Sequence, residues 1–265
     1  MINNKYNQHL QNNTFSTLFV GQNLIRLSEV DSTNNFLKTK ASNSEPLPEG
    51  TVIMADNQFA GRGQQGNIWH TEPGLNLTFS LYLCPSFLPI TLQFMLNMAI
   101  SIGVRNALLG LTGSGLKVKW PNDLYYGNQK LGGMLIENIL AGSSYKASII
   151  GIGINVNQVL FSPEVLGRAT SLHEILQQDV NLIWLLAEIC RHIEQQYLKL
   201  KQGKYESLTE DYVGGLYRFE EFARYRQNGE VFEGRIVKVT DSGMLVIVTG
   251  GQEVEFNFKE VEFLT

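Results

Sequence analysis

The sequence predicts an α+β protein whose last fifty residues form a small, separate all-β module. Residues 88–111 are mostly apolar with a single charge, and the polar residues Gln93, Asn97, Ser101 and Arg105 recur at every fourth position, which is typical of a largely buried core helix. Residues 182–200 carry apolar side chains at spacings of three and four, which predicts a second long helix ending at Gly203. Beyond Tyr217 the chain alternates short apolar strands with tight glycine turns.

The elements between these landmarks complete the α+β pattern. Residues 24–30 are typical of a strand, and Asp31-Ser32-Thr33 supplies N-cap side chains for a helix to about residue 40. Further strands are expected at 51–55, 75–83, 117–120, 124–126, 132–139, 145–156, 231–239, 244–248 and 253–258. The change of character after residue 215 predicts two domains, 1–215 and 216–265.

Composition and charge exclude several classes of protein. The formal net charge of −4 and the pI near 5.6 leave no excess of basic residues to neutralise phosphates, so a nucleic acid is not expected as a partner. Residues 1–17 lack the basic start and apolar stretch of a secretory signal, which predicts a cytoplasmic protein. The 88–111 helix is expected in a soluble core rather than a membrane, and Cys84 and Cys190 as buried free thiols.

A glycine-rich segment, Gly61-Arg62-Gly63-Gln64-Gln65-Gly66, is the first candidate site. The G-x-G-x-x-G spacing also occurs in dinucleotide-binding turns and protein kinases. Here no helix follows and no acidic residue stands about 20 positions on, which excludes the dinucleotide turn, and the absence of H-R-D and D-F-G excludes the kinase. A backbone open to an anion remains, with Arg62 as a two-point donor to phosphate or carboxylate; the alternative is a surface loop.

The second candidate site is Lys119-Trp120-Pro121-Asn122-Asp123 with Lys130-Leu131-Gly132-Gly133 downstream. Asp123 suits Mg²⁺, which takes few protein carboxylates and prefers to share phosphate oxygens. Lys130 precedes two glycines whose missing side chains leave room for a ligand against a strand. Either residue alone would be read as an ordinary surface charge beside a hairpin.

Taken together, the two strings resemble those of biotin–protein ligases. That family's pattern is G-R-G-x-x-G-x-x-W, then K-W-P-N-D, then K-x-x-G-I-L-x-E. The chain matches it at Arg62, Trp69, Lys119 to Asp123, Lys130, Gly133, Leu135 and Glu137, with Met134 in place of the usual Ile. Asp31-Ser32-Thr33-Asn34, Gln58 and Gly151-Ile152-Gly153 extend the match, so it runs from about residue 24 onward. The resemblance implies a mixed sheet like the class II aminoacyl-tRNA synthetase core, with flanking helices, followed by an SH3-like barrel.

The resemblance also implies a reaction. ATP and Mg²⁺ would convert biotin to biotinyl-5'-AMP, and a specific lysine of a biotin carboxyl carrier domain would then displace AMP. Catalytic roles fall to Lys130, Arg62 and Asp123, with Asp123 as the metal ligand. The biotin-binding residues would be Ser32, Thr33, Asn34, Gln58, Arg62, Gly63, Gln64, Lys130, Gly133 and Gly151. The ATP-binding residues would be Arg62, Trp69, Lys119, Asn122 and Asp123.

Two departures from the family stand out. Gln64 occupies a position that is commonly Arg, so a neutral hydrogen bond of about 1 kcal/mol replaces a charged one of about 1.5–3 kcal/mol, and the intermediate is expected to be held less tightly. Only about 23 residues precede the region of resemblance, which is too short for the helix-turn-helix domain of the members that double as repressors. A repressor role is therefore not expected.

Two other functions remain open. A lipoate or octanoate ligase or transferase has a similar fold and also modifies carrier lysines, and a non-catalytic binding protein could use the same scaffold. The complete K-W-P-N-D string favours biotin, and retention of Arg62, Asp123 and Lys130 favours an enzyme. The sequence does not determine the oligomeric state, the acceptor proteins or the affinity for biotin. A homodimer is compatible with it.

Overall fold

A seven-stranded mixed sheet is the centre of the computed structural model, which describes residues 15–42, 47–142 and 144–264. Strand β1 pairs in parallel with β2, and every other neighbouring pair in this sheet is antiparallel. The strands, in their order across the sheet, are β1 (Leu24–Val30), β2 (Val52–Gln58), β3 (Leu77–Leu83), β7 (Ser144–Ile154), β6 (Gln129–Ala141), β5 (Asp123–Tyr126) and β4 (Leu116–Lys119).

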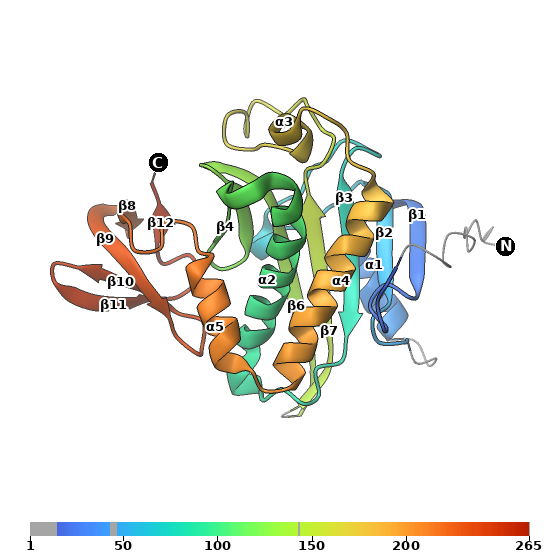
Figure 1. Cartoon of the computed structure of the whole chain (residues 1–265), viewed down its shortest axis with the longest axis horizontal. Coiled ribbons are helices and arrows are strands. Elements are labelled where there is room, and N and C mark those ends of the chain that lie inside the picture. Colours follow the sequence, from blue (N-terminus) through green and yellow to red (C-terminus); the bar gives the residue numbers. More distant parts are fainter. Residues whose placement is uncertain (1–14, 43–46, 143, 265) are drawn as a thin grey trace.

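Helices cover both faces of this sheet. Helices α2 (Gln93–Thr112), α4 (Leu182–Lys201) and α5 (Tyr205–Gly214) lie on one face, as Figure 1 shows, and α1 (Thr33–Ala41) packs on the other against β2, β3 and β7. The short helix α3 (Leu172–Leu176) lies beyond one end of the sheet. Short 3₁₀ turns occur at Gln64–Gly66, Ile90–Leu92 and Gly113–Gly115.

Successive side chains along a strand point to opposite faces of the sheet, and this explains why helices cover both faces. In β2, Val52 and Met54 point into the large core beneath α2 and α4, whereas Ile53 points into a smaller core with Leu37 of α1. All three strand residues are fully buried. A strand with apolar residues on both sides can be stable only between two layers, so this pattern requires helices on each face.

Helix α2 is the buried helix that the sequence predicts. The segment Ile90–Gly115 is the one helix among the described residues that is long and apolar enough to cross a membrane, and 72% of its apolar window is buried. Its polar side chains serve internal contacts, since Asn97 donates to Pro121 O at 2.9 Å and Arg105 to Leu116 O at 3.2 Å. At Gly103 a Cβ would lie 2.7 Å from the Ile193 Cα, so this glycine lets α2 and α4 approach closely.

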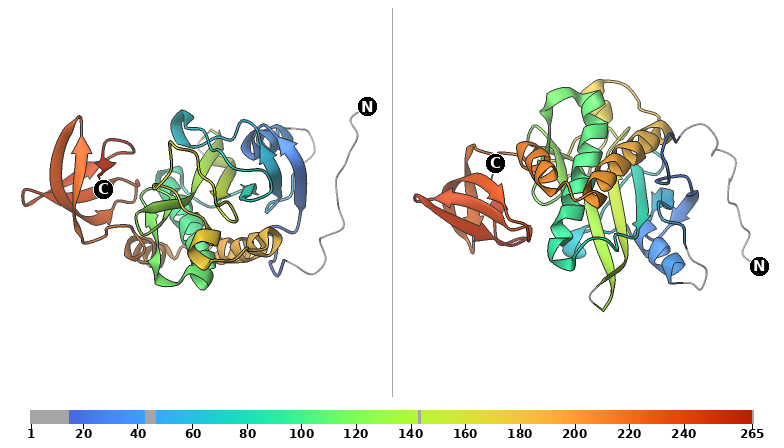
Figure 2. Two further views of the ribbon diagram at one scale, coloured as in Figure 1. Left: turned by 90° about the horizontal axis from the view of Figure 1, so that it is seen from above. Right: turned by 60° about the horizontal axis from the view of Figure 1, so that its bottom comes forward.

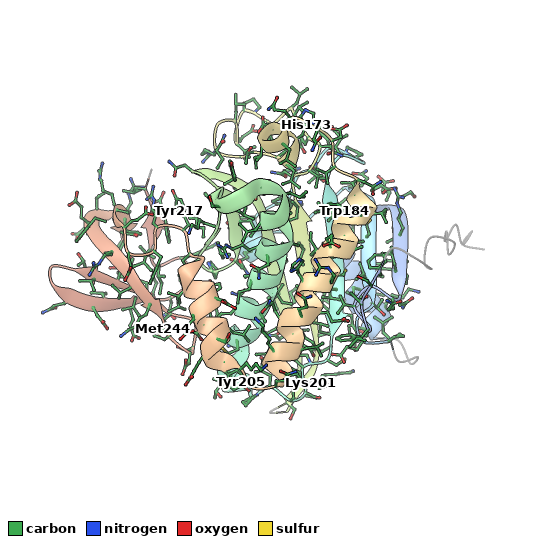
Figure 3. All side chains as sticks on the ribbon, viewed as in Figure 1. His173, Trp184, Lys201, Tyr205, Tyr217 and Met244 are labelled. Carbon is green, nitrogen blue, oxygen red and sulfur yellow. The ribbon has the colours of Figure 1, made fainter. Side chains whose placement is uncertain are left out.

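Helix α4 begins where its sequence supplies a cap. The Asn181 side chain accepts hydrogen bonds from the amides of Ile183 and Trp184, and Lys199 and Lys201 stand in the last turn. Figure 3 shows Trp184 near the start of the helix and Lys201 at its end. Trp184 is 46% exposed, so its indole lies largely at the surface.

A second, five-stranded antiparallel sheet follows α5 and lies beside the first, as both views in Figure 2 show. Its strands, in order across the sheet, are β11 (Gln252–Phe256), β10 (Leu245–Thr249), β9 (Glu230–Val239), β8 (Phe222–Gln227) and β12 (Glu262–Phe263). Trp120, which follows β4 of the first sheet, contacts the part of the chain that forms the second sheet. Its Nε1 donates to Gly243 O at 3.0 Å, and its ring centre lies 5.0 Å from that of Phe258. Tyr217 lies between the two parts (Figure 3) and contacts Tyr125 and Phe263.

Replacing Trp120 with phenylalanine is expected to lower the free energy of unfolding by about 1–3 kcal/mol. The reason is that the substitution leaves the buried Gly243 carbonyl without its donor. Urea denaturation measures the change, with Trp184→Phe as the exposed control, whose effect is expected within about 0.5 kcal/mol. Equal midpoints for Trp120→Phe and the unchanged protein would show that this bond does not stabilise the contact between the two parts.

The predicted fold class is confirmed, with its mixed sheet, flanking helices and terminal β module. The predicted domain boundary at 215/216 falls between α5 and β8. The sequence missed α3, α5, β8 and β12, which are short or lack clear periodicity. Both cysteines are free as expected, but only Cys190 is fully buried, and burial raises the pKa of its thiol. Residues 1–14 of the segment examined for a secretory signal lie outside the described residues.

Candidate active site

The predicted site residues meet at one cavity of about 270 Å³ over strands β3, β6 and β7, on the face that carries α1. Its wall includes the following predicted residues: Ser32, Thr33, Asn34, Gln58, Arg62, Gly63, Gln64, Trp69, Asp123, Lys130, Gly133 and Gly151. These come from the start of α1, the end of β2, the glycine loop and the adjoining strands β5 to β7. Segments separated by more than one hundred residues therefore form a single site.

One end of the cavity is neutral and rich in hydrogen-bonding groups. Gln58 Oε1 accepts from the Thr33 amide at 2.8 Å and from its hydroxyl at 3.0 Å. Ser80 Oγ bonds to both Thr33 Oγ1 and Asn34 Oδ1 at 2.7 and 2.6 Å. The Ser32 hydroxyl makes no capping hydrogen bond to α1, so it is available to a ligand. This network holds buried polar groups in fixed positions, as recognition of a polar ligand head requires.

Glycines on β6 and β7 make room for these side chains. A Cβ at Gly151 would lie 2.5 Å from Asn34 Oδ1, and one at Gly133 would lie 2.6 Å from Asp123 Oδ1. A Cβ at Gly153 would lie 2.5 Å from the indole of Trp69. The glycines thus form the floor of the cavity, where the side chains of Asn34, Asp123 and Trp69 pack directly on the sheet backbone.

Replacing Gly151 with alanine is expected to weaken binding of biotin, the ligand that the sequence resemblance implies, by about 5- to 150-fold, because overpacking of this kind costs about 1–3 kcal/mol. The new methyl group would displace Asn34, which hydrogen bonds to Ser80 and Glu137 hold in place. Calorimetric titration with biotin measures the loss. Gly110→Ala in α2 is the matched control, since a Cβ there meets nothing within 4 Å. Equal affinities of the two variants would exclude this packing role.

The other end of the cavity is charged. Lys130 Nζ bonds to Asp123 Oδ2 at 2.7 Å and lies 6.0 Å from the centre of the Trp69 ring. Both members of this pair are about one third exposed, so the lysine remains accessible from the cavity. The Trp69 Nε1 atom is buried and has no hydrogen-bond partner among the described residues. The ammonium, the carboxylate and the indole therefore stand together at one side of the ligand space.

Arg62 extends from the glycine loop to a second carboxylate. Its guanidinium bonds to Glu137 Oε1 at 3.1 Å and to Asn35 Oδ1 at 2.7 Å. Burial raises the pKa of Glu137, but hydrogen bonds from Lys38 and Asn34 and the charge of Arg62 outweigh it and hold this pKa below its usual range. Glu137 is therefore an ionised anchor for the loop. The sequence analysis included Glu137 in the family pattern but assigned it no site role. Its partner Lys38 belongs to no motif, so the sequence did not identify it.

Gln64 holds the other side of the glycine loop. Its Nε2 donates to Asn122 Oδ1 at 2.8 Å, and Asn122 Nδ2 donates to Asn97 Oδ1 of α2 at 2.9 Å. Asn122 is thus buried behind the cavity wall and contacts it through Gln64. The position that is commonly Arg in the family carries here a neutral link between the loop and the segment that follows β4.

Lys119 does not line the cavity. Its ammonium lies over the rings of Tyr125 and Phe263, 4.8 and 5.0 Å from their centres, and burial lowers its pKa. It therefore contacts the second sheet. The structure adds to the cavity wall a set of residues to which the sequence assigned no site role: Asn67, Ile68, Thr78, Phe79, Met134, Leu135, Ile152, Gly153 and Lys259. Most of these are apolar or contribute backbone, for which a single sequence gives no site signal.

In the part of the chain that the structure describes, Asp123 is the one carboxylate on the cavity wall. Among the described residues no group of three or more His, Cys, Asp or Glu side chains is arranged to hold a metal ion. A single carboxylate fits Mg²⁺, which commonly keeps water and substrate phosphate oxygens as its other ligands.

The model of the Biotin/lipoate A/B protein ligase family matches residues 27–155. The bifunctional ligase/repressor BirA of Bacillus subtilis is 30% identical over 238 residues, which cover 88% of this chain and 71% of BirA. At that identity and coverage, the chain belongs to the biotin protein ligase family.

Solved structures agree with this assignment. Biotin protein ligase from Aquifex aeolicus in complex with biotin and ATP superimposes with a TM-score of 0.75 at 31% identity, covering 91% of this chain and 98% of that one. Biotin acetyl coenzyme A carboxylase synthetase from Helicobacter pylori, with bound biotinylated ATP, gives a TM-score of 0.56 at 26% identity, covering 88% and 99%.

Proposed function

We propose that this chain adenylates biotin to biotinyl-5'-AMP and transfers the biotinyl group to a specific lysine of a biotin carboxyl carrier domain. One observation carries the proposal: a neutral hydrogen-bonding end and a cationic end share one cavity, on a floor of glycines. Such a cavity suits a ligand with a polar head, an apolar body and a carboxylate that must meet a nucleotide phosphate. Membership of the biotin protein ligase family supports the assignment.

The chemistry requires activation because a carboxylate has no good leaving group. A carboxylate oxygen of biotin attacks the α-phosphorus of ATP, and the bond to the β-phosphate oxygen breaks to release pyrophosphate. The amine of the acceptor lysine then attacks the acyl carbon, AMP leaves with the bonding electrons, and the amine proton passes to solvent. The protein supplies no covalent nucleophile in this scheme, so its contribution is positioning and stabilisation of charge.

The residue roles follow from the two ends of the cavity. Ser32, Thr33, Asn34 and Gln58 are proposed to hydrogen-bond the polar ring system of biotin, with Gly63, Gly133 and Gly151 giving it room. Arg62 and Lys130 are proposed to meet the negative charge that develops between the carboxylate and the α-phosphate. Each cation is held by a carboxylate, Glu137 or Asp123, which fixes its position before the reactants bind.

The nucleotide is proposed to contact Arg62, Trp69 and Asp123. Asp123 would hold Mg²⁺, which neutralises phosphate charge when it is bound. Asn122 is proposed to act through its hydrogen bond to Gln64. Lys119 lies at the contact with the second sheet, which favours a supporting role behind the nucleotide site. The need for ATP is the reason to propose that the protein works in the cytoplasm.

Exchange of labelled pyrophosphate into ATP tests the proposed function. Biotin and lipoate are supplied as separate acids, and exchange is expected with biotin only. Exchange with lipoate alone would reassign the chain to the lipoate branch of the family model, and exchange with neither acid would favour a non-catalytic binder. Transfer to a purified carrier domain, followed by mass spectrometry of its target lysine, tests the second half-reaction.

A further inference from the structure

Three amide side chains, those of Gln64, Asn122 and Asn97, form a relay of hydrogen bonds from the glycine loop to helix α2. Gln64 Nε2 donates to Asn122 Oδ1 at 2.8 Å, and Asn122 Nδ2 donates to Asn97 Oδ1 at 2.9 Å. Asn97 Nδ2 donates in turn to Pro121 O at 2.9 Å. Asn97 and Asn122 are both buried, so each depends on these partners in place of water.

The backbone carbonyl of Pro121 determines the direction of the amide relay. A carbonyl oxygen can only accept, so the Asn97 side chain must turn its NH2 group towards it. Tyr212 of α5 donates its hydroxyl to the same oxygen, and the two donors together occupy both lone pairs. Turning the Asn97 amide over would bring its oxygen against the carbonyl oxygen. The orientation of Asn97 is therefore fixed.

The fixed Asn97 amide determines the orientation of the next one. Asn97 Oδ1 can only accept, so Asn122 presents its NH2 group to Asn97 and its oxygen to the glycine loop. The loop therefore meets an acceptor, and position 64 must supply a donor. Gln64 does so through Nε2. Arg, which is common at this position in the family, would also supply a donor.

The amide relay is one of two anchors of the glycine loop. On one side Arg62 bonds to Glu137 and Asn35, and on the other side Gln64 bonds to Asn122. The first anchor is an ion pair, which salt screens, whereas the amide relay contains no charged group. The loop therefore has a neutral anchor that does not depend on ionic strength.

We propose that Asn97 is a positioning residue for the adenylation site: by fixing the Asn122 amide, it requires a donor at position 64 and holds the glycine loop at the cavity. The inference rests on the function proposed above. Gly63, Gln64 and Trp69 line the cavity, so a loop held there keeps biotinyl-5'-AMP enclosed. A loop that opens lets the intermediate leave before the acceptor lysine attacks.

The test compares Gln64→Glu with Gln64→Met in two backgrounds, the unmodified protein and Asn97→Leu. Methionine removes the donor, whereas glutamate also brings its own oxygens against the Asn122 oxygen. In the unmodified background, biotinyl-5'-AMP is expected to dissociate about 2- to 12-fold faster from Gln64→Glu than from Gln64→Met, which is the effect of one hydrogen bond. In the Asn97→Leu background, Asn122 can turn its NH2 group to the glutamate, so the difference should vanish or reverse.

The charge of the new carboxylate is the same in both backgrounds, so it cannot change the ratio between them. An equal ratio in the two backgrounds would therefore overturn the inference. Asn97→Leu added to Gln64→Met should cause no further loss of the intermediate, because the amide relay then no longer reaches the loop. Effects of Asn97→Leu and Gln64→Met that multiply would also contradict it.

Ser101→Ala is the matched control. Ser101 lies one turn further along α2 and is fully buried, and its hydroxyl has no partner among the described residues. This variant should release biotinyl-5'-AMP at the rate of the unmodified protein, whereas Asn97→Leu alone should release it about 2- to 12-fold faster. Equal rates for Ser101→Ala and Asn97→Leu would show that Asn97 does not position the loop.

Cleavage of the ligand-free protein by chymotrypsin after Trp69 is a second measurement, and it needs neither biotin nor ATP. Mass spectrometry follows the break between Trp69 and His70. Gln64→Glu should be cut faster than Gln64→Met, and equal rates would overturn the inference even if Asn97→Leu failed to fold. Absence of pyrophosphate exchange in the unmodified protein would instead refute the proposed function, and the cleavage rates would still test the amide relay.

Discussion

Replacing Lys130 with alanine is expected to lower the rate of biotin-dependent pyrophosphate exchange by about 10²–10³-fold. Lys130 is the cation nearest to Asp123, and its ammonium also lies beside the Trp69 ring. Its removal takes a fixed positive charge from the place where the carboxylate and the α-phosphate are proposed to join. Steady-state exchange at saturating ATP and biotin measures the loss in the chemical step.

The loss should not come from unfolding. The Lys130–Asp123 pair is about one third exposed on each side, and pairs of that kind contribute about 0–1 kcal/mol to stability. Thermal denaturation of the variant is therefore expected to resemble that of the unmodified protein. Lys146→Ala, an exposed lysine on β7, is the matched control and should retain full exchange activity. Full activity of Lys130→Ala would remove Lys130 from the mechanism.

Replacing Arg62 with alanine is expected to have a similar effect, about 10²–10³-fold on the rate of exchange. Arg62 also anchors the glycine loop to Glu137 and Asn35, so dissociation of biotinyl-5'-AMP should become faster. Arg62→Lys keeps the charge but loses the planar two-point donor, and an intermediate loss is expected. Exchange assays and retention of labelled intermediate on a desalting column measure the two effects.

Two comparisons separate the role of Arg62 from that of its ion pair. Arg26 pairs with Asp56 at 2.8 Å on the neighbouring strands β1 and β2, outside the cavity. Arg26→Ala should therefore keep full activity. Glu137→Gln weakens the anchor while it retains Arg62, and a modest loss is expected. If Glu137→Gln were as inactive as Arg62→Ala, then Arg62 would act by fixing the loop and not by contacting the reactants.

Parts of the fold could be predicted because they depend on local periodicity. The apolar stripe of α4 and the four-residue spacing of polar side chains in α2 each identify a helix without reference to the rest of the chain. Helix α5 and strand β8 could not be found this way. Tyr212 of α5 is buried through its contacts with Phe94 and Pro121, which are distant in sequence.

The candidate site could be predicted where two sequence motifs contain residues whose side chains suit a particular chemistry. Arg62, Asp123 and Lys130 were identified in this way and do share one cavity. Glu137 stood inside the second motif, yet its contact with Arg62 appears only when β6 and the glycine loop are brought together. For Lys119, the motif alone suggested a nucleotide contact, whereas the folded chain places its ammonium against the second sheet.

The sequence by itself determined the family, the two motifs and the α+β character, because these depend on residues close together in the chain. Tertiary structure alone decided which carboxylate holds which cation and that Lys259 lies on the cavity wall. The physical reason is that pairing and accessibility depend on distances between segments more than one hundred residues apart. Those distances are fixed by the packing of strands, helices and the terminal sheet, and no local pattern encodes them.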